Sequence, residues 1–357
     1  MNHEDPVLLH TEGRVRHITL NRPRALNALN HAMVARLTEA LAEAEHDDSV
    51  IAVLITGAGE RGLCAGGDIR SIYEDARAGG SESMDFWRDE YRLNARIARF
   101  PKPYVAIMDG IVMGGGVGVS AHGDVRIVTE RSRIAMPETG IGFVPDVGGT
   151  HLLGAAPGEL GTHLALTAEA VGAGDALLCG LADHFVPSRR LAELTADLAG
   201  CGTAAEIEET VLRYASPAPE GELAAHREWI DACYGAASVE EIVERLDNSG
   251  VPAAKQAAET ILTKSPTSLK VTLSALRRAR RIGSLEAVLD QEYRTSCTAF
   301  TRPDFVEGVR ARIIDKDRDP RWSPAALAGV ADADVALFFA PLGDRELGLA
   351  TTSGSTD

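Results

Sequence analysis

The sequence is short of cysteine and lacks the spacings that bind metals or build disulfide frameworks. Among its 357 residues are five scattered cysteines, with no C-x-x-C pair and no H-E-x-x-H pair. We therefore expect no structural zinc site, no disulfide scaffold and no bound metal. Isolated thiols are typical of a reducing compartment, which leads us to predict a cytoplasmic protein.

Long apolar runs and a surplus of positive charge are also missing. No stretch approaches 18 uncharged apolar residues, and residues 1–6 carry no apolar core, so we expect neither a membrane span nor a signal peptide. Asp and Glu total 52 against 36 Lys and Arg, a formal net charge of -16. This acidity argues against a nucleic-acid partner, although a phosphorylated small molecule can still bind in a locally basic or amide-lined pocket.

The first half of the chain alternates between apolar strands and amphipathic helices. The patterns predict strands at 15–20, 49–56, 103–108 and 125–129 and helices at 31–44 and 85–100. Such strands separated by helices indicate a parallel sheet covered on both faces. Strand patterns vanish after about residue 189. We therefore predict an α/β domain at 1–190, a mostly helical region at 191–345 and a flexible tail at 346–357.

Two glycine-rich segments each follow a predicted strand. Gly110–His122 (GIVMGGGVGVSAH) opens a predicted helix, and Gly62–Arg70 reads GLCAGGDIR. Without side chains, backbone N–H groups can approach an anion closely, and two such loops can place two donors on one oxygen. That arrangement suits a carbonyl that becomes an oxyanion. Two alternatives remain open: a dinucleotide-binding fingerprint starting at Gly116, with Glu138 on the ribose, or close helix–strand packing.

A third segment, Ala135–Gly149 (AMPETGIGFVPDVGG), places two acids among apolar residues. A carboxylate in an apolar pocket has a raised pKa, which suits a general acid or base, and the candidates are Glu138 and Asp146. The alternative from spacing alone is that both acids cap the N-termini of helices.

Together, several segments resemble the enoyl-CoA hydratase/isomerase (crotonase) superfamily, and within it a branch that hydrolyses acyl-CoA thioesters. The segments are LNRPRALNAL at 20–29, GLCAGGDIR at 62–70, MGGGVGVSAHGD at 113–124, MPETGIGFVPDVGGTHLL at 136–153, SPTSLKVTL at 265–273, EYR at 292–294, DFVEGVRA at 304–311 and IDKDRDPRWSP at 314–324. The resemblance spans about residues 10–340. It implies an α/β, crotonase-like spiral of β-β-α units with a helical C-terminal region.

By position in these motifs, the resemblance implies catalytic roles for four residues. Gly67 and Gly115 would donate the two N–H groups of an oxyanion hole for the thioester carbonyl. Glu138 matches the family's catalytic glutamate, and Asp146 matches the second acid of the hydrolases. Glu90, on the helix predicted at 85–100, falls where the hydrolases contact substrate, although one exposed acid among several is the alternative.

The resemblance also implies where the substrate binds. Arg24, Ala25 and Leu26 would lie near the adenine or pantetheine of CoA, and Asp68 and Ile69 would also contact substrate. CoA would be part of the substrate, with no separate cofactor. The arginines at 277, 278, 280 and 281 could reach its phosphates, or could form a solvated helix face. Because the superfamily often forms trimers or hexamers, a homo-oligomer is one expectation.

One position departs from the wider superfamily. Hydratases that use two glutamates carry the first at the start of the glycine-rich helix, where this chain has Gly118. Hydration by a pair of glutamates is therefore not expected. Hydrolysis by Glu138 with Asp146 is the main hypothesis. A one-glutamate isomerase and a non-catalytic acyl-CoA-binding protein remain as alternatives.

Overall fold

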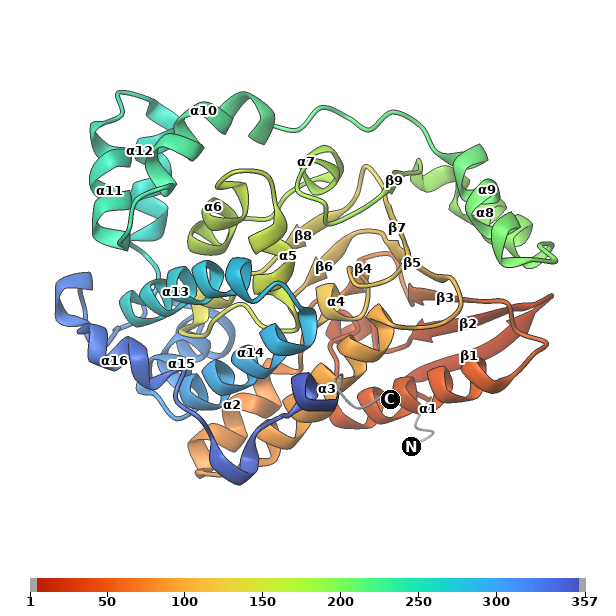
Figure 1. Ribbon diagram of the computed structural model, residues 1–357, viewed down its shortest axis with the longest axis horizontal. Coiled ribbons are helices and arrows are strands. Elements are labelled where there is room, and N and C mark those ends of the chain that lie inside the picture. The colour runs from red at the N-terminus through yellow and green to blue at the C-terminus, as the bar shows by residue number, and fades with distance from the viewer. Residues whose placement is uncertain (1–4, 353–357) are drawn as a thin grey trace. The chain divides into compact units, whose positions relative to one another are not determined.

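The computed structural model describes residues 5–352 (Figure 1). These residues divide into two compact units. Unit 1 contains the residues up to 67, 92–135 and 171–221. Unit 2 contains 68–91, 136–170 and the residues from 222 onward. The units therefore interleave along the chain and do not divide at residue 190, because each is built from segments far apart in sequence.

The predicted parallel sheet forms the centre of unit 1. Its six strands, in the order β1-β2-β3-β5-β7-β9, are β1 (Val7–Glu12), β2 (Val15–Leu20), β3 (Ala52–Gly57), β5 (Tyr104–Met108), β7 (Val125–Val128) and β9 (His184–Phe185). Only the β1–β2 pair is antiparallel. Every residue of β5 is buried, as expected for a central strand with both faces covered. Figure 1 shows β1, β2, β3, β5 and β7 side by side.

A second, smaller parallel sheet lies in the glycine-rich part of unit 1. Its strands β4 (Gly62–Cys64), β6 (Ile111–Met113) and β8 (Arg133–Ala135) have three residues each. Each follows a long strand directly: β4 follows β3, β6 follows β5 and β8 follows β7. This repeated pairing of a long and a short strand, followed by helix, matches the β-β-α units that the family resemblance implies.

Helices cover the large sheet through apolar side chains. In α1 (His31–His46), Asn30 caps the first turn by accepting a hydrogen bond from the Met33 amide at 2.9 Å. The helices α8 (Leu191–Ala199) and α9 (Ala204–Tyr214) join an apolar cluster with the sheet. The short helices of unit 1 are α4 (Gly115–Gly118) and α7 (Ala173–Leu178).

Unit 2 is helical, and α3 (Glu82–Ala98) begins in it. Its other helices are α2 (Ile69–Ala78), α5 (Gly149–Ala155), α6 (Leu160–Thr167), α10 (Leu223–Tyr234), α11 (Val239–Asn248), α12 (Pro252–Ile261), α13 (Pro266–Ile282), α14 (Leu285–Phe300), α15 (Pro303–Val309), α16 (Asp332–Leu337) and α17 (Leu349–Thr352). No strand follows β9 within residues 5–352, which agrees with the predicted loss of strand patterns. In the same range, no helix is long and apolar enough to cross a bilayer.

The C-terminal segment differs in part from the predicted flexible tail at 346–357. Residues 349–352 form α17, and the amides of Leu349 and Ala350 donate to the Asp290 carboxylate at 2.9 and 3.0 Å. These hydrogen bonds attach the segment to α14. Residues 353–357 lie outside the described part of the chain.

Candidate active site

Three of the predicted acids come together inside unit 2. Glu90 lies on α3, Glu138 begins the 3-10 turn Glu138–Ile141, and Asp146 lies in the loop before α5. Their exposed fractions are 2%, 6% and 5%. The structure therefore buries all three, and Glu90 is not one of several exposed acids on its helix.

Burial and mutual repulsion shift the pKa values of this acid cluster, defined as Glu90, Glu138 and Asp146. Burial is the largest cause for each acid and raises the pKa of Asp146 to about 7. The pKa values of Glu90 and Glu138 lie well above their usual range, because burial is reinforced by the nearby charge of Asp146. The three carboxyl groups therefore interact, and ionisation of one disfavours ionisation of the others.

A buried tyrosine positions Asp146. The Tyr91 hydroxyl donates to Asp146 Oδ2 at 2.7 Å and lies 2.7 Å from Ser296 Oγ on α14. This hydrogen bond favours the ionised carboxylate and opposes the effect of burial on the pKa of Asp146. No sequence motif identifies Tyr91 or Ser296 as part of the site. The one indication for Tyr91 is that it directly follows the candidate residue Glu90.

Glu292 of α14 holds the loop that carries Asp146. Its fully buried carboxylate accepts hydrogen bonds from the Gly148 amide at 2.6 Å, the Thr150 amide at 2.8 Å and the Thr150 hydroxyl at 2.5 Å. Burial raises the pKa of Glu292 to about 8, although these hydrogen bonds act in the opposite direction. The EYR motif that supports the family resemblance begins at this residue, but its spacing does not reveal this role.

The loop held by Glu292 is strained. Val147 has φ 53°, a left-handed conformation that a β-branched residue rarely adopts. Gly148, with φ 80°, is the N-cap of α5, and Pro137 precedes the turn that starts at Glu138. Neither Glu138 nor Asp146 is therefore a helix N-cap, and the capping alternative is wrong.

Two carboxyl oxygens of the acid cluster have no hydrogen-bond partner among the described residues. They are Glu138 Oε2 and Glu90 Oε1, and both are buried. Buried polar atoms normally have a partner in the protein or an ordered water. These oxygens are therefore positioned to accept or donate a hydrogen bond to a substrate group or a water molecule.

In unit 1, the two glycine-rich loops pack directly against each other. A Cβ atom on Gly66 would lie 3.6 Å from the Gly115 nitrogen, and one on Gly116 would lie 2.3 Å from the Cys64 carbonyl oxygen. Close packing therefore explains Gly116. The amides of Gly67 and Gly115 donate no backbone hydrogen bond within residues 5–352.

The helix that follows these glycines, α4, has four residues, whereas a dinucleotide-binding unit needs a long helix after its fingerprint. This observation argues against the dinucleotide interpretation. The Gly67 and Gly115 amides belong to unit 1 and the acid cluster to unit 2, and each set is assembled within its own unit.

The structure places the other predicted contact residues as follows. Arg24 and Ala25 are exposed in the 3-10 turn Pro23–Ala25, and Leu26 follows with φ 53°. The turn is fixed within unit 1 by Asn27, whose Nδ2 donates to the Ala58 and Gly62 carbonyls at 3.0 and 3.1 Å. In unit 2, residues 68 and 69 lie half-buried at the start of α2.

The arginine cluster at the end of α13 is largely occupied by protein contacts. Arg277 and Arg280 both pair with Glu159, at 2.7 and 2.8 Å. The guanidinium carbon of Arg278 lies 4.1 Å from the centre of the Phe339 ring. These contacts favour a structural helix face over a phosphate site.

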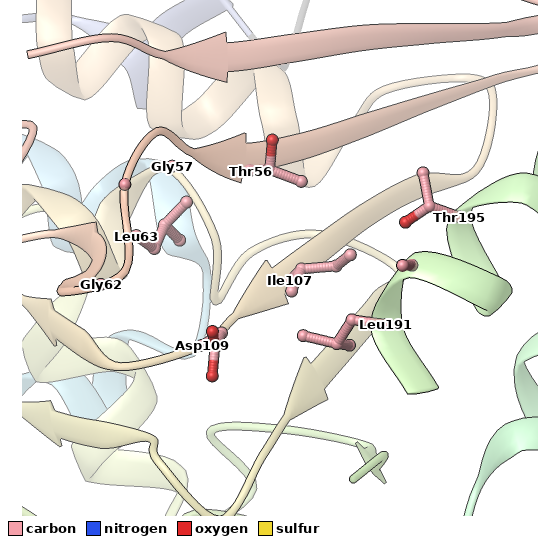
Figure 2. A pocket seen from close by; sticks show the side chains of 10 residues that line it. Thr56, Gly57, Gly62, Leu63, Ile107, Asp109, Leu191 and Thr195 are labelled. Atoms are coloured by element: carbon pink, nitrogen blue, oxygen red, sulfur yellow. The ribbon is translucent and has the colours of Figure 1, made fainter. Parts of the chain in front are cut away.

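Unit 1 also contains an open groove of about 410 Å³ (Figure 2). Figure 2 shows Thr56 of β3 and Ile107 of β5 on one side and Leu191 and Thr195 of α8 on the other. Asp109 is the one carboxylate among the lining residues, and it already accepts hydrogen bonds from Thr129 Oγ1 at 2.6 Å and Arg131 Nε at 3.0 Å. The groove thus offers no free acid or base, and we assign no chemistry to it.

Comparisons of the chain with known proteins agree on one family. The family model for enoyl-CoA hydratase/isomerase matches residues 15–339. A mitochondrial 3-hydroxyisobutyryl-CoA hydrolase from Gallus gallus is 43% identical over 350 residues, covering 96% of this chain and 91% of the relative.

Two solved structures are also similar over almost the whole chain. A carnitinyl-CoA dehydratase from Mycobacterium thermoresistibile has 52% identity and a TM-score of 0.92, covering 96% of this chain and 98% of its own. An enoyl-CoA hydratase from Rhodobacter sphaeroides has 44% identity and a TM-score of 0.90, with coverage of 96% and 99%. The activities in these names differ, so the family alone does not define the reaction.

These comparisons correct the predicted location. The vertebrate relatives are named as mitochondrial proteins, which contradicts the cytoplasmic prediction. Scattered thiols indicate a reducing environment but do not distinguish one reducing compartment from another. The missing apolar core of a signal peptide bears on secretion, whereas mitochondrial targeting uses amphipathic, Arg-rich segments.

The family assignment agrees with the architecture described above. The match extends from β2 to α16 and includes the paired long and short strands, the glycine-rich loops and the helical C-terminal region. The chain belongs to the enoyl-CoA hydratase/isomerase family and has its crotonase fold.

Proposed function

We propose that this protein hydrolyses acyl-CoA thioesters and that its substrate is 3-hydroxyisobutyryl-CoA, which it converts to 3-hydroxyisobutyrate and free CoA. The observation that carries the proposal is the buried acid cluster, in which Asp146 is held by Tyr91 and has a pKa of about 7. The 43% identity to a hydrolase of this name over nearly the whole chain supports the substrate. This reaction would place the protein in valine breakdown.

In the proposed mechanism, the amides of Gly67 and Gly115 polarise the thioester carbonyl. Their support is that both lie in mutually packed loops of unit 1 and have no backbone acceptor within residues 5–352. Backbone donors aimed at a developing oxyanion commonly contribute about 100- to 1000-fold to the rate. A bulky residue at Gly115 should therefore block the reaction.

Glu138 can act by either of two balanced routes. In one, its carboxylate attacks the carbonyl carbon and the C–S bond breaks, leaving a mixed anhydride that water then hydrolyses. In the other, Glu138 removes a proton from a water molecule that attacks the carbonyl directly. Both routes consume one water and release the acid and the CoA thiol, and in both Asp146 orients the water or carries its proton.

The raised pKa values of the acid cluster support this chemistry. The departing thiolate needs a proton, and raised pKa values favour carboxyl groups that can supply one. Glu138 reacts in its ionised form, and its raised pKa makes that form a stronger base. Glu90 would contact the acyl group, and residues 24–26, 68 and 69 would contact the rest of the substrate. No cofactor beyond the CoA of the substrate is needed.

A second candidate is a dehydratase, because the Mycobacterium thermoresistibile relative with that name is 52% identical. Adding or removing water across a double bond with two glutamates requires an acid at the position of Gly118, which has no side chain. Hydrolysis is therefore preferred. A one-glutamate isomerase, or an acyl-CoA-binding protein without activity, would fail the experiment below.

The experiment incubates purified protein separately with 3-hydroxyisobutyryl-, 3-hydroxypropionyl-, crotonyl- and carnitinyl-CoA. Free thiol reports hydrolysis, and the ultraviolet absorbance of the conjugated enoyl thioester reports dehydration. We expect thiol release, fastest with 3-hydroxyisobutyryl-CoA, and at least about a 100-fold loss in Glu138→Gln. The control is Glu259→Gln, on the exposed face of α12, which should keep full activity. Undiminished turnover by Glu138→Gln, or dehydration without thiol release, would refute the proposal.

A further inference from the structure

Two histidines and a glutamate gather on one face of the β1–β2 hairpin in unit 1. The antiparallel register pairs His10 directly with His17, and Glu12 lies two residues further along β1 on the same face. The imidazole rings stack with their centres 4.5 Å apart. One ligand atom from each of the three side chains lies within 4.8 Å of the other two. None of these residues takes part in the proposed reaction.

His17 is unusual because one nitrogen of its buried ring has no hydrogen-bond partner among the described residues. This nitrogen is Nε2, and the exposed fraction of His17 is 5%. A buried imidazole nitrogen normally has a partner, so this side chain itself points to a missing ligand. Burial and the neighbouring His10 lower the pKa of His17, which favours the neutral ring.

The chemistry of these three side chains indicates which kind of cation they would bind. Two imidazole nitrogens with one carboxylate oxygen are suited to Zn²⁺, which takes three protein ligands and keeps its fourth position for water. Sites for Mg²⁺ or Ca²⁺ use oxygen ligands, and Cu(I) prefers thiolates or thioethers, so these ions fit less well. Zinc bonds of about 2 Å place tetrahedral ligand atoms about 3.3 Å apart. Because His10 and Glu12 are exposed, rotation of their side chains can bring the ligands to this spacing.

We propose that His10, Glu12 and His17 bind a single divalent transition-metal cation, best matched by Zn²⁺. Within the described residues, β1 is the edge strand of its sheet and pairs with β2 alone. A cation held by two ligands from β1 and one from β2 joins these strands. Binding therefore stabilises the sheet edge and does not depend on the proposed thioester hydrolysis.

The test uses untagged, full-length, metal-free protein titrated with ZnCl₂ by isothermal calorimetry. Wild type should bind one Zn²⁺ per chain at this site, and its melting temperature should rise with Zn²⁺. His10→Asn and Glu12→Gln should each weaken binding at least about tenfold and abolish that rise. These residues are chosen because they are exposed, so the variants should fold. His46→Gln, an exposed histidine on α1, is the matched control and should bind like wild type.

Three results would overturn the proposal. The first is the absence of saturable zinc binding by wild type, the second is equal affinity in wild type, His10→Asn and Glu12→Gln, and the third concerns cysteine. Titration with Co²⁺ separates the site from the five cysteines, because thiolate ligation produces an intense charge-transfer absorption that imidazole and carboxylate ligands lack. A thiolate band that persists in both variants would assign the metal to cysteine and refute the histidine site.

Discussion

The environment of Asp146 illustrates how single residues set the proton chemistry. Burial raises its pKa to about 7, and one neutral donor, the Tyr91 hydroxyl, lowers it. Glu292 accepts one hydrogen bond from Gly148, at the end of the loop, and two from Thr150, in the first turn of α5. In the proposed reaction the two acids therefore have separate tasks: Asp146 exchanges a proton, and Glu292 holds the structure around it.

Replacing Tyr91 with Phe should shift the pH dependence of hydrolysis. The lost hydrogen bond favoured the charged carboxylate, so the pKa of Asp146 should rise above about 7. Hydrogen bonds to charged groups contribute about 1.5–3 kcal/mol, which corresponds to a shift of about one to two pH units. The limb of the kcat profile that rises as Asp146 ionises should move to higher pH. Thiol release measured between pH 5 and 9 tests this shift.

The matched control for this variant is Tyr214→Phe. Tyr214 also donates to an aspartate, Asp197, at 2.7 Å, but on the α8–α9 pair of unit 1. Its removal should leave the profile unchanged. An unshifted profile in Tyr91→Phe, with kcat lowered equally at every pH, would contradict the proposed link between Tyr91 and the charge of Asp146.

Sequence reasoning reached some of these residues and missed others for a physical reason. Glu90, Glu138 and Asp146 were predicted from motifs, and the structure assembles them in one cluster. Tyr91 and Ser296 are separated by 205 residues, and Glu292 and Gly148 by 144. Hydrogen bonds over such distances follow from tertiary packing and leave no local pattern in a single sequence.

At the scale of elements, α14 supports the acid loop at two points. Glu292 and Ser296 are four residues apart and therefore lie on the same helix face. Glu292 binds the loop backbone, while Ser296 contacts the Tyr91 hydroxyl. The loop needs this support because Val147 has φ 53°, a conformation whose strain costs about 1–3 kcal/mol.

Glu292→Ala should therefore release the loop and lower both stability and activity. The variant leaves the amides of Gly148 and Thr150 buried without acceptors, at about 1–3 kcal/mol each. Urea unfolding should show the loss, and kcat should fall because Asp146 is no longer fixed. Glu292→Gln keeps an acceptor oxygen and should restore part of both.

Glu286→Ala, in the first turn of the same helix, is the control and should cost no more than about 1 kcal/mol. If Glu292→Ala matched this control in stability and turnover, the hydrogen bonds to the loop would not hold the site together.

The elements themselves were predictable to different degrees. In the second half of the chain, apolar periodicity predicts helices at 191–199 and 204–214, and α8 and α9 have these bounds. The pattern at 303–314 predicts one more helix, which instead ends at Val309 and continues as a π-helical turn, Arg310–Ile314. The strands β4, β6 and β8 were not predicted. With three residues each, they are defined by pairing with one another rather than by local pattern.

At the scale of the molecule, the two units explain why composition alone misplaces a boundary. Strand patterns in the sequence end at about residue 190, and the structure likewise has no strand after β9 within residues 5–352. However, helical residues 68–91 and 136–170 belong with the C-terminal helices, and residues 171–221 belong with the sheet. Compactness depends on contacts between distant segments, which composition along the chain does not record.

The buried acids also give the whole molecule a pH-dependent stability. In the unfolded chain, Glu138 and Asp146 ionise near their ordinary pKa values of 4.5 and 3.8, whereas both pKa values are raised in the fold. The folded state therefore binds more protons, and the stability from these groups is complete below about pH 4 and decreases as pH rises through the folded pKa values. Glu159 and Glu307 have lowered pKa values, and their contribution is lost in acid. Stability should hence be greatest at mildly acidic pH.

This balance predicts that removing one acid from the cluster stabilises the protein in a pH-dependent manner. Glu138→Gln should melt near the wild-type temperature at pH 5 but at least about 2 °C higher at pH 8, because the wild type must then hold more negative charge in a buried site. Calorimetry at the two pH values measures the difference. Glu259→Gln, on the surface of unit 2, should show the same offset from wild type at both. If Glu138→Gln also gave equal differences in melting temperature from wild type at both pH values, ionisation of Glu138 would not destabilise the fold. The proposed role of Glu138 in proton transfer would then lose its electrostatic support.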